Sequence, residues 1–211
     1  MTRILLVDDH PMMRRGMRQL IEMQDGLQVV AEAGSGEEAL ALVVSQQPDM
    51  ILMDLNMKGM GGIQTVAELR QRGVSACILM VTVSDNDSDV IAALRAGADG
   101  YLLKDLEPED MVDALLRAER GQLVLSPRLT RILASTLREE KDDRKSLAAQ
   151  LTAREKQILG MIAVGNSNKL IANALGITDA TVKVHVKNLM KKMHFRSRVE
   201  AAIWAVSNQI K

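Results

Sequence analysis

Residues 50–62 read Met-Ile-Leu-Met-Asp-Leu-Asn-Met-Lys-Gly-Met-Gly-Gly. A continuous apolar run stops at one carboxylate, Asp54, and a glycine-rich loop follows it. Such a run is typical of a buried strand that emerges at the edge of a sheet. Because a carboxylate after a strand more often caps a helix or forms a turn, the role of Asp54 depends on what the other strands bring to the same edge.

The first 120 residues repeat one pattern five times, a short aliphatic run followed by a segment with helical periodicity. The runs that predict strands cover residues 3–7, 28–33, 50–53, 77–81 and 100–103. The helical segments that follow them cover residues 11–23, 36–46, 63–71, 87–96 and 108–120. Nearly continuous apolar strands that alternate with helices predict a parallel sheet covered on both faces, here a five-stranded, doubly wound, flavodoxin-like α/β domain.

Polar residues stand where the predicted strands end: Asp8 and Asp9, Asp54, Thr82 and Lys104. Sites in doubly wound sheets lie outside the carboxyl ends of the strands, and in a flavodoxin-like order the first and third strands are neighbours. Converging carboxylates repel one another unless a hard cation such as Mg²⁺ binds them. Taken singly, each residue could equally be a cap or a loop residue. Together they predict a phosphoryl-transfer site with Asp54 as the nucleophile.

The net charge of zero conceals two oppositely charged parts. Residues 151–211 contain ten Lys and Arg against three Asp and Glu, whereas residues 1–150 contain seventeen against twenty-four. A basic C-terminal part predicts a polyanionic partner. Only three residues are aromatic, Tyr101, Phe195 and Trp204, which disfavours recognition of nucleic acid by base stacking.

Four helices and no strand are predicted from residue 151 onward. Thr152 and Glu155 are spaced as a capping box for a helix that reaches about residue 164. A short helix follows Ser167 and ends near Gly176, a longer one runs from Thr178 to about residue 193, and the last covers residues 197–209. Two helices joined by a tight turn with a glycine are typical of a helix-turn-helix.

The helix after Thr178 has two distinct faces. Its apolar residues follow a helical stripe that predicts core packing: Val182, Val186, Leu189 and Met193. Its lysines form a separate line, and Val184 is expected on the exposed side: Lys183, Lys187 and Lys191. Such a helix fits the major groove of DNA, where lysines reach guanine edges and an apolar side chain meets thymine methyl groups. For the helix alone, an ordinary solvated lysine face is the alternative.

Residues 125–150 differ in composition from both flanks. Residues 126–137 predict a helix, and residues 138–150 are dense in charge, as expected for an exposed linker. We therefore predict an α/β domain over residues 1–124, a linker over 125–150 and an all-α domain over 151–211.

The cysteine count and the lengths of the apolar runs indicate the cellular compartment of the protein. Cys77 is the only cysteine, so no intramolecular disulfide can form, and its apolar surroundings predict a buried, unreactive thiol. The N-terminal apolar run, residues 4–7, is too short for a signal peptide, and no run approaches the roughly 18 residues of a membrane span. We expect a cytoplasmic protein with no membrane partner.

Four blocks resemble the signature of response-regulator receiver domains. They are Val-Asp-Asp-His-Pro at 7–11, Met-Asp-Leu-Asn-Met-Lys-Gly-Met at 53–60, Val-Thr-Val-Ser at 81–84 and Gly-Ala-Asp-Gly-Tyr-Leu-Leu-Lys-Asp at 97–105. The resemblance implies that Asp54 is the phospho-acceptor. It implies a Mg²⁺ site formed by Asp8, Asp9, Asp54 and the backbone carbonyl of Asn56. It also implies phosphoryl contacts or switching for Thr82, Lys104 and Tyr101. Lys58 and Asp105 depart from the pattern, because many receivers have proline there.

Residues 151–205 resemble the helix-turn-helix of the NarL/FixJ (LuxR-type) response regulators almost throughout. The resemblance makes Lys183, Val184 and Lys187 candidates for reading bases. Three further lysines suit contacts with phosphates, which position a protein without specifying sequence: Lys169, Lys191 and Lys192. His185 and His194 lack metal-ligand spacing, and Trp204 is expected in the core, with a dimer interface as its alternative.

These features predict a transcription factor that is controlled by phosphorylation and is not an enzyme. A sensor histidine kinase would phosphorylate Asp54, and the helix-turn-helix would bind double-stranded DNA as a homodimer. Residues 55–60 and 82–85 resemble nitrate/nitrite regulators of the NarL subfamily. Three alternatives compete: an aspartyl-phosphate phosphatase, a constitutive DNA binder with an interaction-only receiver, and a small-molecule-sensing LuxR protein. Asn56 weakens the first, because haloacid-dehalogenase phosphatases carry a second acid there.

Overall fold

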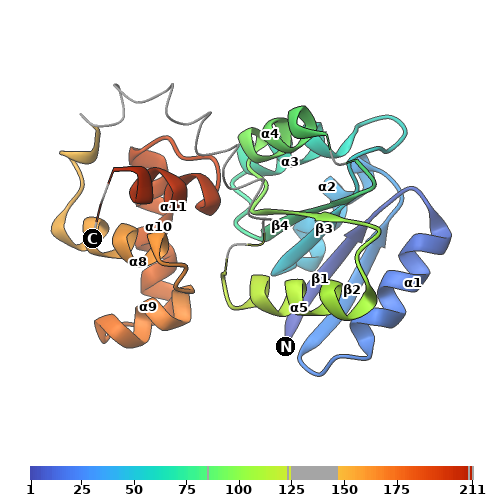
Figure 1. Cartoon of the computed structure of the whole chain (residues 1–211), viewed down its shortest axis with the longest axis horizontal. Coiled ribbons are helices and arrows are strands. Elements are labelled where there is room, and N and C mark those ends of the chain that lie inside the picture. The colour runs from blue at the N-terminus through green and yellow to red at the C-terminus, as the bar shows by residue number, and fades with distance from the viewer. Residues whose placement is uncertain (85, 123, 125–146, 209, 211) are drawn as a thin grey trace. The chain divides into compact units, whose positions relative to one another are not determined.

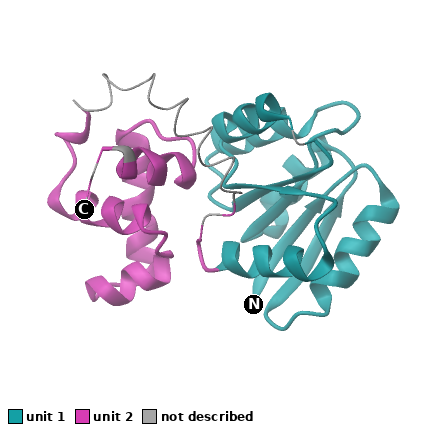
Figure 2. Cartoon of the chain, in the orientation of Figure 1, with its two compact units in different colours: residues 1–119 teal, residues 120–211 magenta. Residues whose placement is uncertain are grey.

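The computed structural model describes residues 1–211 except 85, 123, 125–146, 209 and 211. The chain forms two compact units, residues 1–119 and 120–211 (Figure 2). The predicted linker, 125–150, and its helix at 126–137 lie mostly or wholly outside the described residues. The proposed linker boundaries therefore stay a prediction.

The first unit is built on a five-stranded parallel sheet in the order β2-β1-β3-β4-β5 (Figure 1). Its strands are β1 Thr2–Val7, β2 Leu27–Ala33, β3 Met50–Met53, β4 Cys77–Thr82 and β5 Gly100–Leu103. Every side chain of the central strand β3 is buried, as expected for a sheet covered on both faces. The predicted doubly wound α/β fold is confirmed.

Five helices cover this sheet: α1 Pro11–Glu22, α2 Gly36–Gln46, α3 Gly62–Gln71, α4 Asp87–Ala96 and α5 Pro108–Glu119. Helices α1 and α5 pack on one face, and α2, α3 and α4 on the other (Figure 1). Local residues set where helices begin, since Ser35 and Asn86 accept hydrogen bonds from the first turns of α2 and α4. Helix α4 ends at Gly97, whose φ of 115° suits glycine.

Cys77 corrects one prediction. It is only partly buried, whereas the remaining residues of β4 are buried. Cys77 is the first residue of the strand, and an apolar run does not by itself determine how fully the neighbouring elements cover a side chain at the strand end. Its thiol is therefore less enclosed than the apolar run indicated.

The second unit contains the helices α8 Ala153–Ala163, α9 Asn168–Leu175, α10 Asp179–Lys192 and α11 Arg198–Ser207. They share one hydrophobic core, in which Trp204 is 3% exposed and its ring lies 5.7 Å from that of Phe195. Core packing of Trp204 is thus confirmed, as is the capping box of Thr152 and Glu155. Within the described residues, no helix combines the length and apolar character needed to cross a bilayer.

Candidate phosphoacceptor site and nucleic-acid interface

The register of the sheet brings the predicted residues to one edge. Val7 of β1 pairs with Met53 of β3, so Asp8 and Asp54 leave the sheet side by side. The backbone N–H of Asp54 donates to the carbonyl oxygen of Val7 at 2.8 Å, which holds the two strand ends together. On the other side of β3, Thr82 ends β4, and the N–H of Lys104 donates to its carbonyl at 2.8 Å.

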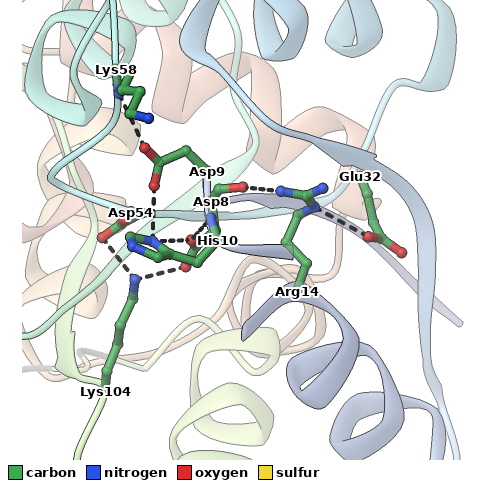
Figure 3. Close-up of polar contacts among 8 residues, drawn as sticks. All are labelled: Asp8, Asp9, His10, Arg14, Glu32, Asp54, Lys58 and Lys104. Atoms are coloured by element: carbon green, nitrogen blue, oxygen red, sulfur yellow. Dashed lines mark hydrogen bonds and ion pairs between the residues drawn. The ribbon is translucent and has the colours of Figure 1, made fainter. Parts of the chain in front are cut away.

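Lys104 bridges two carboxylates at this edge (Figure 3). Its Nζ lies 2.7 Å from Asp8 Oδ2 and 3.1 Å from Asp54 Oδ1, and its side chain is 8% exposed. Burial lowers the pKa of Lys104, but the hydrogen bonds and charges of Asp8 and Asp54 outweigh burial and raise it. The ammonium therefore stays charged although its side chain is buried.

Asp54 is a desolvated carboxylate. Burial raises its pKa above the ordinary value, the charge of Asp8 adds to this rise, and Lys104 only partly opposes it. Asp8, Asp54 and Arg14 line a small cavity whose remaining wall is apolar: Leu6, Val7, Met13, Met17, Leu52 and Val81. A positive charge placed beside Asp54 therefore stabilises the charged form of its carboxylate.

The acidic cluster has the composition of a metal site. Ligand atoms of Asp8, Asp9, His10 and Asp54 all lie within 4.8 Å of one another. Within the described part of the chain, the lysine that pairs with these three carboxylates is Lys104, which contacts Asp8 and Asp54, so negative charge is in excess. Among the described residues, the buried Asp9 Oδ1 accepts no well-aligned hydrogen bond, and the polar atom nearest to it in an ion-pair contact is His10 Nδ1 at 2.9 Å. A buried carboxylate oxygen without a well-aligned hydrogen bond is costly unless a cation binds it, so these residues fit a metal ion.

Arg14, which was not among the predicted site residues, holds the backbone next to the acidic cluster (Figure 3). Its guanidinium donates to the carbonyl oxygen of Asp8 and also to Glu32 Oε2 at 3.3 Å. The N–H of His10 donates to Asp8 Oδ1 at 2.7 Å. Only the spacing of Arg14, one turn after the strand end, could have indicated this role.

Ser84 connects the two predicted switch residues. The buried Tyr101 donates its hydroxyl hydrogen to the carbonyl oxygen of Ser84 at 2.9 Å, and the N–H of Ser84 donates to Thr82 Oγ1 at 3.1 Å. Thr82 is fully buried and Tyr101 is 4% exposed, so both switch residues are enclosed. Asn56 is exposed in the loop after β3.

The loop after Asp54 is held by two backbone hydrogen bonds. The N–H of Lys58 donates to Asp9 Oδ2 at 3.3 Å, and the N–H of Met60 donates to Glu37 Oε1 at 3.2 Å. A proline at position 58 has no N–H and could not make the first bond. Lys58 is therefore a backbone donor to the acidic cluster, which its sequence position alone did not reveal.

Helices α9 and α10 form the predicted helix-turn-helix. Gly176 ends α9 with a left-handed φ of 64°, and the Thr178 side chain caps α10 by accepting from the N–H of Thr181. Val182, Leu189 and Met193 are fully buried and Val186 packs partly against the same core, which confirms the predicted apolar stripe. Val184 is 57% exposed, as predicted.

The lysines proposed for DNA contact are all exposed: Lys169, Lys183, Lys187, Lys191 and Lys192. Two of them also form ion pairs. Lys183 Nζ lies 3.1 Å from Asp179 Oδ2 in an exposed pair, which is weak and can yield to a phosphate or a base. Lys192 Nζ lies 2.8 Å from the buried Glu155 Oε2. Lys192 therefore has a structural partner that sequence reasoning missed.

Replacing Lys192 with Met is expected to destabilise the second unit by about 1–2 kcal/mol, because Glu155 loses the partner of its buried charge and the pair is only partly screened by solvent. Burial raises the pKa of Glu155, but hydrogen bonds from Lys192 and Thr152 outweigh it and lower the pKa. Glu155 thus contributes stability above its unfolded pKa, and this is lost as pH falls through the folded pKa. The variant should lose stability at higher pH than the wild type.

Urea unfolding followed by Trp204 fluorescence measures this change in the second unit alone, because Trp204 is the only tryptophan. Lys191→Met is the matched control, because Lys191 is an exposed neighbour on the same helix and, among the described residues, the lysine paired with Glu155 is Lys192. Equal midpoints for the two variants would contradict a structural role for the Glu155–Lys192 pair.

The fold and the site define a class of protein: a phospho-accepting α/β signalling domain joined to a helix-turn-helix DNA-binding domain. Residues 4–116 match the response regulator receiver domain, and residues 149–205 match the bacterial regulatory proteins of the luxR family. The chain belongs to the LuxR-type response regulators. It is a phosphorylation-activated transcription factor and not an enzyme, so the phosphatase alternative is set aside. Family membership implies a kinase partner and DNA binding.

Relatives cover the whole chain. It is 51% identical to the nitrate/nitrite response regulator protein NarL of Escherichia coli (strain K12), over 98% of this chain and 96% of that protein. It is 48% identical to NarP of the same organism, over 95% and 93%. Among solved structures, the response regulator ChrA of a heme-sensing two-component system is 31% identical, covers 100% of this chain and 98% of that one, and gives a TM-score of 0.52.

Proposed function

We propose that Asp54 accepts a phosphoryl group from a sensor histidine kinase and that Mg²⁺ assists at Asp8, Asp9, Asp54 and the backbone carbonyl of Asn56. The paired strand ends of β1 and β3 support this assignment, because they juxtapose Asp8 and Asp54. Bound Mg²⁺ would supply positive charge to the phosphoryl oxygens and the carboxylates.

The chain's own residues would then divide the work. Asp54 would supply the attacking carboxylate oxygen, and burial leaves that oxygen weakly solvated. Lys104 would move its hydrogen bonds from Asp54 to a phosphoryl oxygen. Thr82 would turn its hydroxyl toward another phosphoryl oxygen and donate to it, and this movement would carry Oγ1 away from the N–H of Ser84. Because Ser84 also accepts from Tyr101, the two residues would shift together.

The second unit would then bind double-stranded DNA as a homodimer on paired half-sites. Lys183, Val184 and Lys187 would face base edges, supported by their exposure on α10 opposite the buried stripe. Lys169, Lys191 and Lys192 would contact phosphates. Lys192 would have to share its ammonium with Glu155, so we expect its contribution to DNA binding to be the smallest of the three.

We infer that the controlled genes respond to nitrate or nitrite. The names and the near full-length similarity of the NarL and NarP relatives support this inference. We also propose the domain boundaries 1–124 and 151–211, with residues 125–150 as the linker between them.

One experiment tests the site and the output together: DNA footprinting with and without beryllofluoride and Mg²⁺. Beryllofluoride with Mg²⁺ should increase protection of the operator, and either reagent alone should not. Protection of equal strength without any addition would favour the constitutive DNA binder. Mass spectrometry after incubation with acetyl phosphate and Mg²⁺ should place the added phosphoryl group on Asp54.

Replacing Lys58 with Pro is expected to weaken Mg²⁺ binding relative to Lys58→Met. Both variants lose the same positive charge, but only the proline variant loses the N–H that donates to Asp9. A partly exposed hydrogen bond to a carboxylate is worth about 1 kcal/mol, so the difference should be about fivefold in affinity. Titration calorimetry with Mg²⁺ measures it, and equal affinities would show that this bond does not position Asp9.

A further inference from the structure

His10 lies over the acidic cluster although no proposed step uses it (Figure 3). It precedes α1 at the N-cap position, yet its side chain makes no capping hydrogen bond. Its Nδ1 instead lies 2.9 Å from Asp9 Oδ1 and 3.2 Å from Asp8 Oδ1. The imidazole is thus directed toward two carboxylates, with 69% of its side chain exposed.

The spacing of these three atoms suits ligands on one ion as well as it suits hydrogen bonds between His10 and the two carboxylates. Metal–ligand bonds of about 2.1 Å place neighbouring donor atoms about 3.0 Å apart at right angles and about 3.4 Å apart at tetrahedral angles. The two distances from His10 Nδ1 agree with these separations. Lys104 binds Asp8 Oδ2 and Asp54 Oδ1, which leaves Asp8 Oδ1 and Asp9 Oδ1 on the side of His10. Among the described residues, Asp9 Oδ1 is the buried oxygen that accepts no well-aligned hydrogen bond, although His10 Nδ1 lies 2.9 Å from it.

We propose that His10 is a nitrogen ligand that lets this cluster bind a transition metal of the Zn²⁺ and Co²⁺ class together with Asp8 and Asp9. The proposal rests on the cation site of the proposed function and extends it to a second class of ion. The type of ligand decides which ion is preferred, because imidazole nitrogen suits these transition metals whereas Mg²⁺ prefers oxygen. A neutral imidazole protonated at Nε2 offers the lone pair of Nδ1, so no covalent change in the protein is needed.

The two classes of ion would compete for the same carboxylates. Mg²⁺ would use oxygen ligands and water, and its binding would not depend on His10. Zn²⁺ or Co²⁺ would add the nitrogen of His10, and would exclude Mg²⁺ by occupying Asp8 and Asp9. The choice between Mg²⁺ and a transition metal therefore depends on the side chain of His10, which is not one of the oxygen ligands.

Titration of the full chain with Co²⁺, followed by its visible absorption and by calorimetry, tests the proposal at one fixed, mildly alkaline pH. His10→Ala is expected to weaken Co²⁺ and Zn²⁺ binding by about 10-fold or more, with less than about a twofold change for Mg²⁺. His185→Ala is the control and should leave all three affinities unchanged. His10→Gln, which keeps a polar side chain, should behave like His10→Ala, and circular dichroism verifies that both variants are folded.

Two outcomes overturn the proposal. Equal Co²⁺ affinity in the wild type and in both His10 variants means that His10 is not a ligand. An equal loss of Co²⁺ and Mg²⁺ affinity means that His10 only orients Asp8. Failure of the wild type to bind Mg²⁺ is a different result, because it contradicts the cation site of the proposed function.

Discussion

Asp54→Asn is expected to abolish covalent phosphorylation and the gain in DNA affinity that phosphorylation produces. The amide keeps the size of the carboxylate and its place after β3, but it lacks the nucleophilic oxygen pair that attacks phosphorus. Incubation with acetyl phosphate and Mg²⁺, followed by mass spectrometry, should show no added phosphoryl group. Footprinting of the treated variant should match that of the untreated wild type.

The Asp54→Asn variant should remain folded. Burial raises the pKa of Asp54 in the folded state, so its contribution to stability is greatest below the unfolded pKa and is lost as pH rises through the folded pKa. At neutral pH the charged carboxylate therefore costs stability, and the neutral amide should unfold at an equal or higher urea concentration. Lys104 keeps Asp8 as its partner.

A matched replacement separates the role of Asp54 from a general loss of acidic charge. Asp25→Asn removes one carboxylate from an exposed turn of the same unit and should leave phosphorylation and DNA binding intact. DNA binding by Asp54→Asn as tight as that of the phosphorylated wild type would refute control through this residue. The constitutive alternative would then be correct.

Lys183→Ala and Lys187→Ala are each expected to weaken specific DNA binding strongly while leaving phosphorylation unchanged. A lysine that reads a base edge contributes about 1–3 kcal/mol of discrimination, or about 5- to 150-fold in affinity. Lys183 is 65% exposed and its pair with Asp179 is weak, so little internal structure is lost with it. Fluorescence anisotropy with specific and non-specific duplexes, over a range of salt concentrations, measures the effect.

The comparison between duplexes decides what the lysines do. A base contact lowers affinity for the specific duplex more than for the non-specific one, whereas a phosphate contact lowers both and reduces the salt slope by about one. Lys156→Ala is the control, because Lys156 is exposed on α8, outside the helix-turn-helix. Unchanged specific binding by both α10 variants would rule out α10 as the recognition helix.

Periodicity made the fold predictable because each element satisfies its own local rules. The strands β3 and β5 and the helices α2 and α4 begin and end at the predicted residues, since apolar runs and caps are local signals. The apolar stripe of α10 was predictable for the same reason. Cys77 was not, because burial at a strand end depends on how far the covering helices extend.

The candidate site was predictable where it depends on strand ends. In a parallel sheet every strand ends at the same edge, so Asp8, Asp54 and Lys104 had to converge there once the strand order was known. The family resemblance then implied what each residue does: Asp54 as phospho-acceptor, Asp8 as a Mg²⁺ ligand and Lys104 as a phosphoryl contact.

What the sequence by itself determined was the α/β domain, the helix-turn-helix, the acid cluster at the strand ends and the basic face of α10. These follow from periodicity, capping and charge within short segments. Only the tertiary structure decided which groups the side chains meet: Lys58 N–H at Asp9, Arg14 at the Asp8 carbonyl, His10 over the carboxylates and Lys192 at Glu155. Such contacts join residues through packing geometry and rotamers, which short sequence patterns do not specify. Lys58, an unexplained departure in the opening stretch, thereby becomes a donor to the site.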